Sequence, residues 1–237
     1  MARLRSALLL LAGVTLVVTT ACSPAATTTP RPTPTATARP TPSPTPLPPD
    51  TLFVGVLGIG IGTYALAAIP VALLKNEAKF HGAASVIVHF VTRRAGRTLG
   101  SLESVAVDLG PGETLAVTGD CTDACNGATS LGATVAVGSW TTTVGPIFAT
   151  TSATYSCHPC HTAHGYGEVK GTLTPSSPVA AGVAVVGFAM CANKAGVILG
   201  GGSEQFVWQA GSSLSADIPV VLNAAPSSCA IGASTGW

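Results

Sequence analysis

Residues 157–164 hold the densest group of side chains that could do chemistry. Cys157, Cys160 and His161 form a Cys-x-x-Cys-His pattern, which in c-type haem proteins supplies two thioether links and an axial ligand. The three histidines of this run, His158, His161 and His164, are candidate ligands for zinc or copper if the thiols stay reduced. The sequence favours a plain disulfide between Cys157 and Cys160 with no cofactor, and haem c or a bound metal are the alternatives.

Cysteine parity supports disulfides in the rest of the chain. Six of the seven cysteines follow residue 100, and an even number suits an oxidising compartment. Two pairs are predicted from short separations and the third by elimination: Cys121–Cys125, Cys157–Cys160 and Cys191–Cys229. The last bridge would close a loop of about 39 residues, which contributes roughly 4 kcal/mol to stability through loop-closure entropy.

The remaining composition argues against an enzyme and against nucleic-acid binding. Only 9% of the residues are charged, so no pair of carboxylates stands out as an acid–base site. Residues 51–237 contain seven Lys/Arg against nine Asp/Glu, which leaves no basic stripe for phosphates. A Gly-x-Ser-x-Gly string around Ser234 lacks the helix that must follow a nucleophile elbow. We therefore predict no catalytic residue.

The first 22 residues have the pattern of an export signal. Two arginines precede an apolar run of 11 residues, 8–18, which is too short to span a bilayer. Residues 19–22, Thr-Thr-Ala-Cys, resemble a bacterial lipobox, whose cysteine is lipidated and becomes the mature N-terminus. The sequence predicts a signal peptide over 1–21 and a lipid anchor at Cys22. Ordinary cleavage that leaves Cys22 as a thiol is the alternative.

A Pro/Thr-rich segment follows at residues 22–50 and contains ten of the chain's 18 prolines. Such a segment cannot bury enough apolar area to fold, and its prolines favour an extended polyproline conformation. We predict a disordered stalk, up to roughly 85 Å long, between a lipid anchor and a folded body.

The segment 51–74 has no charged residue and is long enough for a membrane helix. However, Gly58, Gly60 and Gly62 alternate with apolar residues, which is the period of a β-strand, and glycine disfavours a helix. We predict buried strands here, and a membrane helix is the alternative.

The two halves of residues 51–237 resemble each other. The run 88–100 matches 188–200, including the Ala-Gly pairs at 95–96 and 195–196. Other matched positions are Thr63-Tyr64 and Thr154-Tyr155, Val71 and Val169, Leu74 and Leu173, Leu115 and Leu214, and Trp140 and Trp237. Residues 157–164 are an insertion in the second half. A repeat of this length predicts a duplicated domain, with copies at 51–140 and 141–237.

The pattern within each half is that of β-strands. Val86, Val88 and Phe90 alternate with other residues, and β-branched residues, glycine and threonine dominate throughout. Short strands separated by turn residues at a spacing of about ten predict an all-β fold of two tandem antiparallel β-sandwiches.

The alternation also bears on Cys191. If Phe188 and Met190 point into the core as the matching Val88 and Phe90 do, Cys191 points to the opposite face. The Cys191–Cys229 bridge is then predicted as a surface link between neighbouring strands, unless a β-bulge resets the alternation.

The order of strands and turns in the first half resembles the FxLYD type of bacterial domain. The resemblance is carried by Lys75-Asn76, the strand 86–90, the Ala-Gly turn and the Leu-Gly-Pro-Gly-Glu-Thr run at 109–114. The second half is similar but has Thr174-Pro175 in place of Lys-Asn, and neither half carries the family's Tyr-Asp. FxLYD domains are immunoglobulin-like sandwiches, common in lipoproteins and without an assigned activity. The resemblance implies two tandem immunoglobulin-like β-sandwiches after the signal peptide and linker.

Together these features predict an exported lipoprotein, anchored to the outer face of a bacterial cell membrane, with a non-catalytic binding or envelope-scaffold role. Its predicted partners are the membrane, through Cys22, and an unknown protein or cell-envelope ligand, but not nucleic acid. The alternative is an electron-transfer or metal-binding module centred on the insertion at 157–164.

Overall fold

The computed structural model describes residues 49–64, 67–121, 125, 127–157 and 165–236. Strands make up the secondary structure of these residues, which contain no helix and hence none that could cross a membrane. The prediction of an all-β fold built from antiparallel sheets is confirmed. The predicted signal peptide at 1–21, the lipidation site Cys22 and the stalk as far as residue 48 lie outside the described residues.

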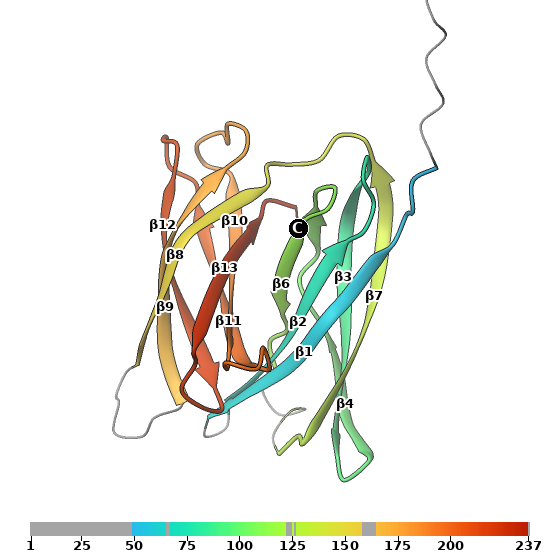
Figure 1. Cartoon of the computed structure of the whole chain (residues 1–237), viewed down its shortest axis with the longest axis vertical. Helices are drawn as coiled ribbons and strands as arrows, with labels where there is room; N and C mark the ends of the chain where they lie inside the picture. Colours follow the sequence, from blue (N-terminus) through green and yellow to red (C-terminus); the bar gives the residue numbers. More distant parts are fainter. Residues whose placement is uncertain (1–48, 65–66, 122–124, 126, 158–164, 237) are drawn as a thin grey trace, which may run out of the picture. The chain divides into compact units, whose positions relative to one another are not determined.

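The first half of the body consists of two sheets with a shared core. In one sheet the order of strands is β1 (Val54–Tyr64), β2 (Ala67–Asn76) and β6 (Thr114–Thr118). In the other, β3 (Gly82–Arg94) pairs with β4 (Arg97–Glu103), β5 (Val107–Leu109) and β7 (Ser130–Thr141). Leu74, Val88 and Phe90 are fully buried between the two sheets, which lie side by side on the right of Figure 1.

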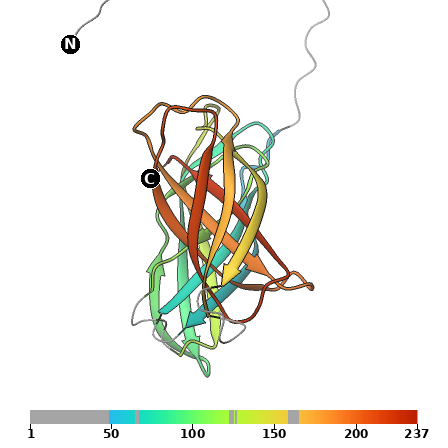
Figure 2. The same cartoon turned by 90° about the vertical axis from the view of Figure 1, so that its left-hand side faces the viewer.

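The second half is a single sheet of six strands in the order β13-β10-β11-β12-β9-β8. These strands are β8 (Phe148–Cys157), β9 (Gly165–Pro175), β10 (Ala184–Ala192), β11 (Ile198–Val207), β12 (Leu214–Leu222) and β13 (Ser228–Ser234). The two edge strands, β8 and β13, contact each other, so the sheet curls around a core of its own (Figure 2). Trp208 and Phe148 pack together in that core.

The sheet β1-β2-β6 lies between the other two layers, and this position explains the charge-free segment 51–74. Ala72 and Leu74 of β2 face the core shared with β3, whereas Val71 faces the other way and packs with Ala116 and Ile198. A strand that is buried on both faces needs apolar residues at every position rather than at every second one. The prediction of strands in place of a membrane helix is therefore confirmed. Burial is confirmed for β2, whereas in β1 only Val54 and Gly62 are buried.

The alternating glycines of β1 allow the middle sheet to approach the second half closely. A Cβ atom on Gly60 would lie 2.5 Å from the carbonyl oxygen of Ile198, and one on Gly62 would overlap the carbonyl oxygen of Val221. Gly200 of β11, which has a φ of 145°, lies against Gly62 from the other side. At Gly62 and Gly200 the two backbones are thus in contact where neither residue has a side chain.

The two halves belong to one compact unit, and the predicted boundary at 140/141 falls one residue before the end of β7. Val186 and Phe188 of β10 belong to the core of the first half. Hydrogen bonds also cross between the halves: the backbone N–H of Thr63 donates to Asn223 Oδ1 at 2.8 Å, and that of Asp108 donates to Ser234 Oγ at 3.0 Å.

The position of Cys191 differs from the prediction. Cys191 and Cys229 face each other across β10 and β13 and form the predicted disulfide, but Cys191 is fully buried in the core of the second half. No bulge lies between Phe188 and Cys191: the β10–β13 register runs without a shift, and the one shift between β10 and β11 comes after Cys191. The prediction of a disulfide on the surface was wrong because the side chain of Phe188 points out of its own half and into the core of the first half.

Candidate functional site

A cleft of about 360 Å³ lies at the end of the body where β1 turns into β2. Its walls come from both halves: Tyr64, Ile69, Thr118, Gly119 and Asp120 from the first, and Tyr166, Ser203, Pro219 and Val221 from the second. The volume falls in the range of ~300–1,000 Å³ that is usual for small-molecule sites. The cleft exists only because the two halves pack together.

Two of the residues that line the cleft are partly exposed tyrosines. Tyr64 and Tyr166 are 44% and 45% exposed, so each presents much of its ring to solvent. The backbone beside them fixes their positions. A Cβ on Gly165 would lie 2.6 Å from Cδ2 of Tyr64, so the Tyr64 ring packs on the backbone of the residue before Tyr166. Both tyrosines line the cleft.

The carboxylate of Asp120 sits on a segment that is held from both sides. Before it, the backbone N–H of Gly119 donates to the carbonyl of Pro70 at 3.1 Å. After it, the backbone of Cys121 pairs with Ala68 of β2 in an antiparallel β-bridge, and its side chain forms the predicted disulfide with Cys125. Asp120 is therefore presented by a constrained backbone, which lowers the entropy lost when a ligand binds.

The cleft is lined mostly by apolar surface, with a few polar groups, and it is nearly uncharged. Asp120 is the one charged side chain among the described lining residues, and Thr118 and Ser203 add hydroxyl groups. The described walls contain no lysine or arginine to receive a phosphate or a carboxylate. Half-exposed phenol rings beside hydroxyls and one carboxylate suit a ligand with both apolar faces and hydrogen-bonding groups.

The residues predicted for haem or metal binding lie mostly outside the described part of the chain. Cys157 is the last residue of β8 and is half-buried. His158, Cys160, His161 and His164 belong to 158–164, which the structure does not describe. Within the described residues no group of three or more His, Cys, Asp or Glu side chains could hold a metal ion. The Cys157–Cys160 disulfide and its haem and metal alternatives stay predictions.

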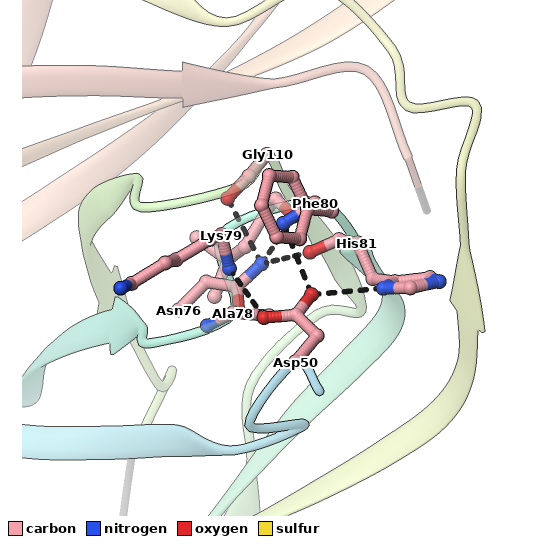
Figure 3. Close-up of polar contacts among 8 residues, drawn as sticks. Asp50, Asn76, Ala78, Lys79, Phe80, His81 and Gly110 are labelled. Carbon is pink, nitrogen blue, oxygen red and sulfur yellow. Dashed lines mark hydrogen bonds and ion pairs between the residues drawn. The ribbon is translucent and has the colours of Figure 1, made fainter. Parts of the chain in front are cut away.

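A second polar cluster lies near the start of β1, around Asp50 (Figure 3). Its carboxylate accepts hydrogen bonds from the backbone N–H groups of Lys79 and Phe80, at 2.7 and 3.0 Å, and lies 2.8 Å from Nδ1 of His81. Burial on its own would raise the pKa of Asp50, but these hydrogen bonds outweigh it and lower the pKa to about 2. Both oxygens hold the loop, so we interpret Asp50 as a structural clamp rather than a catalytic base.

Asn76 ties the same loop to the turn after β5. It is fully buried, and its amide nitrogen donates to the carbonyls of His81 and Gly110, each at 2.9 Å. Its Oδ1 accepts from the backbone N–H of Ala78 at 3.0 Å. A buried amide with its groups paired in this way fixes loop geometry, which gives Asn76 a structural role.

Glu113 stands in the turn next to this network. The backbone N–H of Gly110 donates to Glu113 Oε2 at 2.6 Å. Burial raises the pKa of Glu113 to about 7, and the hydrogen bond from Gly110 opposes this shift without cancelling it. The folded protein therefore binds a proton at Glu113 that the unfolded chain releases near pH 4.5.

The substitution Glu113→Gln tests this shift. Between about pH 4.5 and pH 7 the native state of the wild type holds more protons than the unfolded state, so its stability falls as the pH rises. Glutamine cannot ionise and should remove this loss. We expect urea unfolding to show E113Q more stable than wild type by on the order of 2 kcal/mol at pH 8, with the gain greatly reduced at pH 4.

Glu204→Gln is the matched control, because Glu204 is exposed. Its unfolding free energy should follow that of the wild type at both pH values. Parallel pH profiles for E113Q and wild type would contradict the buried state of the Glu113 carboxyl.

The roles of several residues of these sites were not predicted from the sequence. Asp50 fell at the end of the predicted stalk but belongs to the folded body, and His81 was taken as isolated although Asp50 is its neighbour. Tyr166 carried no signal, and Tyr64 served only as a repeat marker. Ser234 is 3% exposed and accepts from the backbone N–H of Gly236, in keeping with the rejection of a nucleophile elbow there.

Comparison with models of protein families, with curated proteins and with solved structures found no match to the chain. The FxLYD resemblance therefore stays a prediction, and the function has to be argued from the geometry alone.

Proposed function

We propose that the protein is an exported lipoprotein that acts by binding a ligand at the cell surface, with the cleft between its halves as the binding site. The observation that carries the proposal is the pair of disulfides, Cys121–Cys125 and Cys191–Cys229. Structural disulfides persist in oxidising compartments and are rare in the cytosol. The Cys121–Cys125 disulfide also immediately follows Asp120 of the cleft, so formation of this disulfide constrains the backbone that presents Asp120.

The arrangement of strands supports an origin by internal duplication. In the first half β2 pairs with β1 on one side and with β6 on the other, and Leu74 lies opposite Leu115. In the second half β9 pairs in the same way with β8 and β12, and Leu173 lies opposite Leu214. The last strand of each half also pairs with the first strand of a hairpin. In the first half β7 pairs with β3 of the β3–β4 hairpin, and in the second half β13 pairs with β10 of the β10–β11 hairpin. We infer two copies of one immunoglobulin-like unit.

One matched pair does not occupy equivalent positions in this scheme. Gly60 is opposite Val71, whereas Tyr155 is opposite Val169, so Tyr155 corresponds in register to Gly60 rather than to Tyr64. The site of the proposed function is therefore not repeated. Tyr155 of β8 therefore does not occupy the position of the cleft tyrosine on β1.

Export and lipidation are tested by expressing the full chain and a Cys22→Ala variant in a bacterial host. We expect the wild type to partition into the detergent phase of Triton X-114 and to have lost residues 1–21. The variant should partition into the aqueous phase. Wild-type protein that stays in the cytoplasm with reactive thiols would overturn the proposal.

The intact mass of the same material separates the alternatives at 157–164. A disulfide at Cys157 and Cys160 predicts no thiol labelling at either residue and no added mass. Covalently attached haem would add the mass of the porphyrin and a Soret absorption band, and would favour electron transfer over ligand binding.

A further inference from the structure

We propose that the cleft binds a neutral saccharide chain, with Tyr64 and Tyr166 as stacking platforms for sugar rings. This inference rests on the proposed binding function and names the class of its ligand. A pyranose ring has apolar C–H faces and a rim of hydroxyl groups, so it needs flat aromatic surfaces together with hydrogen-bonding side chains.

The aromatic part of this requirement is met by the two tyrosines. Tyr64 and Tyr166 lie on β1 and β9, from different halves, yet the Tyr64 ring packs on Gly165. Both keep more than two fifths of their surface exposed, which leaves ring area available to a ligand. The backbone at both tyrosines is fixed before binding. Thr63, next to Tyr64, donates hydrogen bonds to Asn223, and Tyr166 is the strand partner of Val221 in the β9–β12 pair.

The polar part is met by groups that come from two further segments. Thr118 is the last residue of β6 and Asp120 follows it, and Ser203 lies on β11. Hydroxyl and carboxylate oxygens accept hydrogen bonds from sugar hydroxyls, and the threonine and serine hydroxyls also donate. Side chains of this kind can satisfy a ligand that offers donors and acceptors in alternation around a ring.

The charge of the cleft selects against other ligand classes. An anionic ligand would face Asp120 with no cationic side chain among the described lining residues. A purely apolar ligand would leave the hydroxyls and the carboxylate unpaired, which costs binding free energy. A cationic ligand would find one carboxylate and two aromatic rings, so it is the competing ligand class, and choline represents it in the test.

The test uses the full chain with Cys22→Ala, which removes only the anchor, and isothermal titration with cellohexaose, chitohexaose, maltohexaose and choline chloride. We expect at least one of the three oligosaccharides to bind and choline not to bind. Tyr64→Ala and Tyr166→Ala should each weaken that binding at least tenfold. Phe80→Ala is the matched control, because Phe80 is also 44% exposed but lies outside the cleft, and it should leave binding unchanged.

Asp120→Asn distinguishes a neutral ligand from a cation. An asparagine keeps an oxygen acceptor, so saccharide binding should change by less than about threefold, whereas a cation would lose its counter-charge and bind at least tenfold more weakly. Binding of choline alone, binding of no oligosaccharide, or equal loss in F80A would overturn the saccharide assignment. The Cys22 fractionation is independent of these outcomes, so the proposed surface role stands or falls separately.

Discussion

Replacing both Cys191 and Cys229 with alanine is expected to lower the free energy of unfolding by about 4 kcal/mol. The bridge joins residues 38 apart in the sequence, so it removes much of the freedom of the unfolded second half. The same loss should lower the melting temperature by about 8–16 °C for a body of this size. Urea unfolding and calorimetry of the purified protein would measure both quantities.

The double variant Cys121→Ala/Cys125→Ala is the matched control for this prediction. Its disulfide closes a separation of only four residues, for which loop closure contributes about 2 kcal/mol. Equal losses in the two double variants would show that loop length is not the source of the stabilisation. A smaller loss for Cys191 and Cys229 than for the control would contradict the prediction outright.

Replacing Gly62 with alanine is expected to cost about 3 kcal/mol or more, because the added methyl would meet the backbone of β12. The atom in its way is the carbonyl oxygen of Val221, and Gly200 lies on the same contact. Neither can move like the end of a flexible side chain, so the interface between the halves would have to open. Near-ultraviolet circular dichroism should report loosened packing, and urea unfolding should report the loss of stability.

Gly58→Ala on the same strand is the control for this effect. A Cβ on Gly58 would lie 3.3 Å from Cδ1 of Ile198, the mobile end of a side chain. We expect its unfolding free energy to stay within about 0.5 kcal/mol of the wild type. If Gly62→Ala behaved like Gly58→Ala, the close approach of the two halves would be refuted.

Much of the fold was predictable because local sequence and structure agree. The alternation of Gly58, Gly60 and Gly62 gave a strand, and the strand is β1. The Ala-Gly pairs at 95–96 and 195–196 lie between paired strands, and their glycines have φ values of 81° and 78°. Such turns are set by the few residues in them, so they can be inferred without the rest of the chain.

The direction of the side chains on β10 was not predictable in the same way. Val185 and Ala189 face the core of the second half, whereas Val186 and Phe188 face the first half. The side chains on both faces of β10 are apolar. Their pattern therefore indicates a strand but does not indicate which face of the strand packs against which core. The packing partner decides this, and the partner lies in the other half of the chain.

The cleft was out of reach for a related reason. Tyr64 and Tyr166 are separated by about a hundred residues, and nothing in the sequence near either tyrosine indicates the other. Asp50 follows a run of prolines and looks like part of it, yet its two oxygens hold the loop at 79–81. Sites of this kind depend on tertiary packing, which local patterns do not encode.

The length of β1 has a consequence for how the body would stand on a surface. Asp50 is hydrogen-bonded to Lys79 just before β1 begins, and Tyr64 is the last residue of that strand, which runs along the body in Figure 1. Eleven residues of extended strand cover roughly 35 Å. For a molecule tethered through its N-terminal segment, the cleft tyrosine on β1 therefore lies at the opposite end of the strand from the tether.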